Sequence, residues 1–150
     1  MPGDAPKPAA HPSRGAIVIY CDGASLGNPG PAGAGFVLVG PKGKILSRRA
    51  VPLGPMTNNA AEYRALIAAL HEAAALGARK VRVRADSELL VKQMRGEYKV
   101  SAPNLKPLHA WARKLLARFD EVDFEAIPRE ENAEADRLAK AAAQRTRSGA

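Results

Sequence analysis

The sequence predicts a single α/β domain, and three features of the chain support that class. At 150 residues, the chain is long enough for one domain with a buried core. Its first part contains three short apolar segments joined by turns, which is typical of an antiparallel meander. The pattern then changes to helical periodicity, and from there strands alternate with helices, which is typical of an α/β unit with parallel strands.

The two ends of the chain are expected to lie outside this domain. Residues 1–14 contain four prolines and almost no large apolar side chain, so they are predicted to form a disordered tail. The folded domain is expected to span residues 15–144, with a frayed tail at 145–150. No apolar segment suits a secretory signal or a membrane span, so we expect a soluble, cytoplasmic protein with no membrane partner, and a monomer is the default.

The predicted meander consists of three segments. The first strand is predicted over 16–22, where 16–21 are apolar and rich in β-branched side chains, and 33–39 and 44–51 follow as the second and third strands. Asn28-Pro-Gly30 provides the turn between the first two strands, and the nearby glycines permit close approach of another backbone or a ligand. Pro52 and Pro55 are expected to end the third strand, because proline cannot donate a hydrogen bond to a sheet.

The rest of the chain alternates between helices and strands. An Ala- and Leu-rich helix is predicted over 57–76, with Thr57 or Asn58 as its N-cap and Gly77 as its stop. Strict alternation over 80–86 predicts a fourth strand. The remaining elements are a short helix at 87–94, a loop at 96–103, a helix at 104–119 starting near Pro107, a strand at 121–127, a loop at 128–132 and a helix at 133–143. The apolar side of the 104–119 helix is expected to comprise Leu108, Trp111, Leu115 and Leu116.

Four carboxylates occupy positions that call for an explanation. Asp22 and Asp86 end the first and fourth strands, Glu62 lies on the apolar line of the first helix, and Asp136 opens the last helix. Parallel pairing of the first and fourth strands would place Asp22 beside Asp86, and packed helices could bring the other two to the same edge. Two ordinary interpretations stay open: a surface aspartate in a hairpin for Asp22, and a glutamate favoured by the helix dipole for Glu62.

Such a cluster of like charges requires counter-ions. Four carboxylates in one pocket repel one another, and divalent cations relieve that repulsion. Two ions roughly 3.5–4 Å apart are the usual arrangement in phosphoryl-transfer enzymes. Oxygen ligands without His or Cys favour two Mg2+ ions, with Mn2+ as a substitute, over zinc.

The overall charge favours a nucleic-acid partner. The formal net charge is +8, which suits polyanions. With only 3 Phe, 3 Tyr and 1 Trp, a stacking platform for single strands is disfavoured, so contacts to the backbone are expected instead. The single cysteine, Cys21, excludes an internal disulfide and a zinc pattern, and it is expected to be a small buried apolar residue.

Four sequence blocks, in order, resemble type 1 ribonuclease H over about residues 16–143. They are Asp22-Gly with Asn28-Pro-Gly and Gly33-Ala-Gly35, then Thr57-Asn-Asn-Ala-Ala-Glu-Tyr63, then Ala85-Asp-Ser-Glu-Leu-Leu-Val-Lys-Gln93, then Asn132-Ala-Glu-Ala-Asp-Arg-Leu-Ala139. The resemblance implies a ribonuclease H-like fold, with a five-stranded mixed sheet of three antiparallel and two parallel strands and helices on both faces. It implies hydrolysis of the RNA strand of RNA/DNA hybrids, leaving 3′-hydroxyl and 5′-phosphate ends. By position, the family's acidic metal ligands fall on Asp22, Glu62, Asp86 and Asp136.

The same resemblance implies residues that contact the hybrid. Asn28, Asn58, Asn59 and Gln93 match positions that face the minor groove, where 2′-hydroxyls distinguish RNA from DNA, and amide side chains both donate and accept there. Asn28 as a plain turn residue and Asn58 as a plain helix cap remain open alternatives. Two further positions, Thr57 and Asn104, match residues that seat a phosphate of the DNA strand.

The chain departs from the family pattern in two places. Many members have a histidine in the loop before the last aspartate, whereas this chain has Pro128-Arg-Glu-Glu-Asn132 there. Arg129 is the nearest functional candidate, with an exposed loop charge as its alternative. The segment 95–106 is also too short for the basic protrusion of several bacterial members, so Lys92, Arg95 and Lys99 are expected to supply affinity for the hybrid. Both departures resemble the short archaeal and related bacterial branch.

Two other functions are compatible with parts of this pattern. A nuclease of the same fold could act on another nucleic acid, although the two asparagines beside Glu62 disfavour it. A non-catalytic hybrid-binding module is also conceivable. Four carboxylates argue against a pure binder, because negative charge in the groove weakens phosphate binding.

Overall fold

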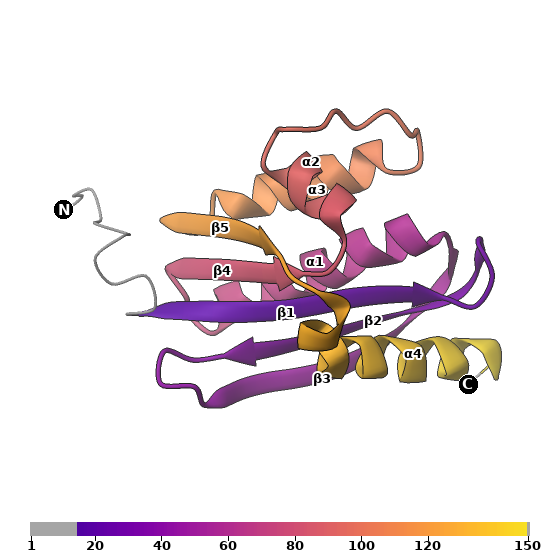
Figure 1. Cartoon of the computed structure of the whole chain (residues 1–150), viewed down its shortest axis with the longest axis horizontal. Helices are drawn as coiled ribbons and strands as arrows, with labels where there is room; N and C mark the ends of the chain where they lie inside the picture. Colours follow the sequence, from indigo (N-terminus) through magenta and orange to yellow (C-terminus); the bar gives the residue numbers. More distant parts are fainter. Residues whose placement is uncertain (1–14, 150) are drawn as a thin grey trace.

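The computed structural model describes residues 15–149, and the predicted tail at 1–14 lies outside the described residues. Its sheet contains five strands in the order β3-β2-β1-β4-β5 (Figure 1). The first three pair antiparallel, and β4 and β5 join β1 in parallel. The predicted mixed sheet is therefore confirmed. The strands are β1 (Ala16–Ser25), β2 (Gly30–Val39), β3 (Ile45–Met56), β4 (Lys80–Ala85) and β5 (Glu121–Ala126).

Four α-helices and one short 3-10 turn accompany the sheet in the described chain. They are α1 (Asn58–Ala75), α2 (Glu88–Met94), α3 (Lys106–Leu116), η1 (Arg129–Asn132) and α4 (Ala133–Arg147). Thr57 is the N-cap of α1, where its hydroxyl accepts a hydrogen bond of 3.2 Å from the Ala60 amide. Gly77 follows the helix with φ +82°, a conformation that glycine adopts without strain.

The meander strands are longer than predicted. β1 continues to Ser25 rather than ending at Asp22, and β2 begins at Gly30 rather than 33. β3 continues to Met56, although Pro52 and Pro55 were expected to end it. Pro52 remains in register opposite Gly33 of β2. The expectation was wrong because β3 is an edge strand of the sheet, and an edge strand tolerates proline where its missing N–H would face outward.

The two main helices cover opposite faces of the sheet. Gly23 approaches the backbone of α1 at Ala61 so closely that no Cβ would fit. On the neighbouring strand, Gly35 approaches α4 at Ala135 in the same way. Gly35 pairs with Asp22 rather than with Gly23, and because adjacent residues of a strand face opposite sides, α1 and α4 lie on different faces (Figure 1).

The C-terminal helix extends beyond its predicted end. A last helix ending at residue 143 and a frayed tail from 145 were expected, but α4 continues to Arg147. The hydroxyl oxygen of Thr146 lies 2.8 Å from the carbonyl oxygen of Ala32 and 2.9 Å from that of Leu53, so its single proton is shared between these two acceptors. These contacts tie the last helical turn to β2 and β3, which is why it does not fray.

The core follows the predicted apolar pattern with one exception. Cys21 is buried, as expected. Trp111, expected on the buried side of its helix, is 42% exposed and instead lies at the surface beside His71 and Arg64. Among residues 15–149, no helix combines the length and apolar character that a membrane span requires.

Candidate active site

The four predicted carboxylates converge at one end of β1. Asp22 lies within β1, Asp86 directly follows β4, Glu62 lies in the second turn of α1, and Asp136 lies in the first turn of α4. The carboxyl group of Asp22 hydrogen-bonds with that of Asp136, and the Glu62 carboxyl hydrogen-bonds with Asp22. Parallel pairing of β1 with β4 places Asp86 close enough for its charge to act on both.

Glycines bring the helices to this place. Gly23 follows Asp22 and lets α1 approach with Glu62, while Gly35, opposite Asp22, lets α4 approach with Asp136. A Cβ at either position would overlap helix backbone. The close approach predicted for the glycine-rich segment is thus confirmed, although its partners are helices of this chain.

The cluster strongly favours protonated carboxyls. The pKa of Asp22 is raised to about 8, first by burial, then by the hydrogen bond with Asp136 and by the negative charges of Asp86 and Asp136. The pKa of Glu62 is raised well above its usual value by burial and by the charges of Asp22 and Asp86, and Arg129 lowers it in part. Burial and the same three carboxylates, Glu62, Asp22 and Asp86, raise the pKa of the Cys21 thiol.

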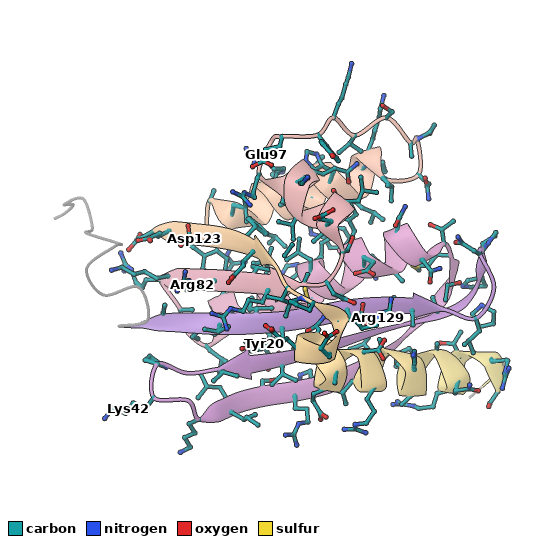
Figure 2. All side chains as sticks on the ribbon, viewed as in Figure 1. Tyr20, Lys42, Arg82, Glu97, Asp123 and Arg129 are labelled. Atoms are coloured by element: carbon teal, nitrogen blue, oxygen red, sulfur yellow. The ribbon has the colours of Figure 1, made fainter. Side chains whose placement is uncertain are left out.

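Two cations partly compensate the negative charge. Arg129 Nε lies 3.5 Å from Asp86 Oδ2, and Lys140 Nζ lies 3.2 Å from Asp136 Oδ2. The Arg129 side chain is 73% exposed, and Figure 2 shows it at the start of η1, close to α4. Both cations offset the negative charge of the carboxylates, and a bound metal ion would do the same.

The donor set fits hard divalent cations. It consists of carboxylate oxygens without histidine, the chemistry preferred by Mg2+ and Mn2+. Within residues 15–149, however, no three His, Cys, Asp or Glu side chains are already arranged as a ligand group. Binding of ions would therefore require the carboxylates to ionise and to turn toward a common centre.

One buried amide connects three elements of the site. Asn132 is 1% exposed, and its Nδ2 donates to the carbonyl oxygen of Cys21 at 2.9 Å and to Asp86 Oδ1 at 3.1 Å. Sequence reasoning missed this residue as a site residue. The only signal was its place at the start of the block that contains Asp136. Lys140 was also missed, although its spacing of four residues from Asp136 on a helix predicts an ion pair.

The predicted asparagines lie together beside the carboxylates. Asn28 Oδ1 accepts from the Asn58 amide at 3.0 Å, and Asn58 Oδ1 accepts from the Ser25 amide at 2.9 Å. Backbone donors thus fix both amide oxygens, which leaves both NH2 groups pointing away from these bonds. Asn58 and Asn59 are exposed. Ser25 was not expected from the sequence to take part in this arrangement.

Thr57 and Asn104 contact each other, whereas Gln93 lies inside the protein. Asn104 Nδ2 lies 3.3 Å from Thr57 Oγ1, and both line a pocket of about 390 Å³ together with Arg64. Gln93 is 5% exposed, and its amide accepts from the Tyr63 hydroxyl at 2.7 Å and donates to the Lys99 carbonyl at 3.5 Å. Because both ends of this amide are engaged inside the protein, we do not retain Gln93 as a substrate contact.

Comparison with known proteins gives a consistent result. A family model described as reverse transcriptase-like matches residues 20–142. Ribonuclease HI of Halobacterium salinarum is 46% identical over 132 residues, 87% of this chain and 66% of that protein. The bifunctional protein Rv2228c of Mycobacterium tuberculosis is 45% identical over 124 residues. These 124 aligned residues cover 82% of this chain and 34% of that protein, so the chain spans about a third of the mycobacterial relative's length.

Solved structures agree in fold over nearly the whole chain. The N-terminal ribonuclease H domain of Rv2228c superposes with a TM-score of 0.86 at 43% identity, covering 90% of this chain and 99% of that one. LC11-RNase H1, solved in complex with an RNA/DNA hybrid, superposes with a TM-score of 0.81 at 43% identity and covers 86% of this chain and 97% of that one.

Proposed function

Because the chain belongs to the type 1 ribonuclease H family, we propose that it hydrolyses the RNA strand of RNA/DNA hybrids with two divalent metal ions. The expected products carry 3′-hydroxyl and 5′-phosphate ends. The convergence of Asp22, Glu62, Asp86 and Asp136 in a protein of net charge +8 carries the proposal. A related protein, LC11-RNase H1, has been solved with a hybrid bound.

The four carboxylates would hold the metal ions, and the protein positions each carboxylate differently. When bound, metal ions supply an activated water and stabilise the leaving oxygen. Asp22 lies within β1, and Asp86 directly follows β4, which pairs with β1, so the sheet holds both residues and they are suited to be the least replaceable ligands. Asp136 follows η1 and is partly exposed, so it has more freedom to adjust. Glu62 joins the metal site to the asparagine-lined surface of the same helix.

The amide groups support recognition of a minor groove. Asn28 and Asn58 use their oxygens inside the protein and present NH2 donors, which suit the N3 and O2 acceptors that every base pair shows in that groove. Asn59 lies next to them on the exposed side of α1, where its amide could both donate to and accept from a 2′-hydroxyl.

The pocket at the start of α1 supports binding of a DNA-strand phosphate. The Thr57 hydroxyl, the Asn104 amide and the Arg64 guanidinium line it, and no carboxylate of the described chain is among its lining residues. Arg64 lies over the ring of Trp111, 5.7 Å from its centroid, and this contact orients the cation. Arg129, near Asp86, is placed to neutralise a phosphate once it leaves that carboxylate.

The test compares three labelled duplexes with the full chain. RNA/DNA hybrid, RNA duplex and DNA duplex are each incubated with Mg2+ and with excess chelator, and the ends of the products are identified. Cleavage of RNA in the hybrid only with Mg2+ is expected, with the DNA strand intact. Binding without cleavage would indicate a hybrid-binding module, cleavage of DNA would indicate another nuclease of this fold, and full cleavage in chelator would refute the metal mechanism.

A further inference from the structure

Asn132 is a buried polar residue to which neither the family resemblance nor the proposed reaction assigns a role. Its two amide hydrogens point to different elements, one to the carbonyl of Cys21 and one to Asp86. Cys21 directly precedes Asp22 in β1, and Asp86 directly follows β4. Asn132 itself is the last residue of η1 and directly precedes α4, whose first turn carries Asp136.

One amide group thereby joins three of the four segments that carry carboxylates. The alternative support for Asp86 is Arg129, whose side chain is largely exposed and whose Nε lies 3.5 Å away. A flexible exposed cation fixes a carboxylate less well than a buried amide, because exposed pairs must hold two mobile side chains in one geometry. Asn132 is therefore the group that sets the orientation of Asp86.

Packing alone does not explain an asparagine at this position. Its Oδ1 is buried and has no hydrogen-bond partner among the described residues. Buried polar atoms are nearly always paired, and an unpaired acceptor destabilises the fold. A residue selected only for stability here would not leave an acceptor unsatisfied, whereas a residue needed for its two donors would.

We propose that Asn132 is a positioning residue, which orients the Asp86 carboxylate for metal binding by holding it to β1. The inference rests on the proposed metal site. Groups that hydrogen-bond to metal-ligating side chains typically change metal affinity or activity 10–100-fold when they are replaced. The effect of losing Asn132 should appear in Mg2+ affinity and kcat, and substrate KM should change little.

Two variants separate the effect of losing the hydrogen-bond donors from the effect of changing the size of the side chain. Asn132→Asp retains the shape, loses both donors and places a negative charge against Asp86. Asn132→Ser retains one hydroxyl donor and removes the unpaired oxygen. Gln144→Glu is the matched control, because it adds the same charge to α4, the helix that follows Asn132, about 18 Å further along, where Gln144 accepts from Arg147.

The primary readout is the Mg2+ concentration that gives half of the maximal rise in melting temperature, measured on the full chain without substrate. We expect at least a tenfold increase for Asn132→Asp, a smaller increase for Asn132→Ser and none for Gln144→Glu. Kinetics on a hybrid at fixed Mg2+ should show kcat lowered at least tenfold for Asn132→Asp, with KM within about twofold of the parent.

The outcomes distinguish this inference from the proposed function. A parent chain that neither responds to Mg2+ nor cleaves a hybrid refutes the proposed function. A parent that does both, alongside a folded Asn132→Asp variant with unchanged Mg2+ response and kcat, refutes the role of Asn132 alone. If Asn132→Asp has a lower melting temperature in chelator but an unchanged Mg2+ midpoint, the positioning role is also refuted, since that result indicates a structural role only. If Asn132→Asp does not fold, the same measurements are compared between Asn132→Ser and the parent.

Discussion

The replacement Asp22→Asn should stabilise the metal-free protein while abolishing cleavage. Asp22 is 4% exposed and shares a hydrogen bond with Asp136 among like charges. Its folded state therefore favours the protonated carboxyl, which an asparagine amide imitates in shape and in its ability to donate. The unfolded chain has no such preference, so ionisation of Asp22 opposes folding.

The size of this effect follows from the pKa. The pKa of Asp22 is about 8, against an ordinary value of 3.8, and each pH unit between these values is worth about 1.4 kcal/mol. Because the folded state keeps a proton that the unfolded chain releases, stability falls as the pH rises from about 4 to about 8. The upper limit at pH 8 is about 5 kcal/mol. We expect a net gain of about 1–3 kcal/mol, less than this limit, because the asparagine amide must itself be buried and does not reproduce every hydrogen bond of the protonated carboxyl.

The assay is urea denaturation of the parent and variant at pH 5.5 and pH 8, in chelator and in Mg2+. In chelator, the stability advantage of Asp22→Asn should grow by at least 1 kcal/mol between the two pH values. With Mg2+, the parent should regain stability at pH 8, because metal replaces the proton, and the variant should regain little. Asp123→Asn is the matched control, since Asp123 is exposed on β5 far from Arg129 (Figure 2).

Three results would contradict the reasoning. An Asp22→Asn protein that is less stable than the parent at pH 8 in chelator would mean that Asp22 is a structural residue. An advantage that does not change with pH would mean that its ionisation is not coupled to folding. Near-parental cleavage by this variant would further remove Asp22 from the proposed metal site.

Three further predictions concern the other ligands, substrate recognition and packing. Asp86→Asn should lower kcat at least 100-fold, whereas Asp136→His should retain measurable cleavage because histidine still binds metal; equal losses would contradict the difference in rigidity. Asn58→Asp keeps the oxygen that accepts from β1 but loses the NH2 donors, so KM for the hybrid should rise about tenfold, and an unchanged KM would remove Asn58 from the groove. Gly35→Ala should lower the free energy of unfolding by about 1–3 kcal/mol or more through overlap with α4, while the control Gly54→Ala, in open space, should change it by less than about 0.5 kcal/mol.

The sequence by itself determined the order and type of nearly every element. Alternation and helical periodicity are local properties, and they predicted β4 over 80–86 and α1 with Thr57 as one of two possible caps. The sequence placed Asp22 and Asp86 at the ends of two predicted parallel strands, and that placement predicted their convergence at one edge of the sheet, although β1 continues past Asp22 to Ser25. The glycine-rich segment was recognised from the sequence as a place of close approach, and the structure shows that Gly23 and Gly35 provide it.

The tertiary structure decided what depends on neighbours distant in sequence. β3 continues past Pro52 because it is an edge strand, and α4 continues to Arg147 because Thr146 reaches two carbonyls more than 90 residues away. Neither the edge nor those carbonyls can be read from a local pattern. The position of an element in the sheet and its partners across the chain therefore set its length.

The same distinction applies to the site. A motif position suggested that Gln93 contacts substrate, but the fold buries its amide between Tyr63 and Lys99. The role of Asn132 could not be inferred from spacing, since its partners lie 111 and 46 residues away. Residue type determines which hydrogen bonds an amide is able to make, but only the packed structure decides whether those bonds face a ligand or the interior.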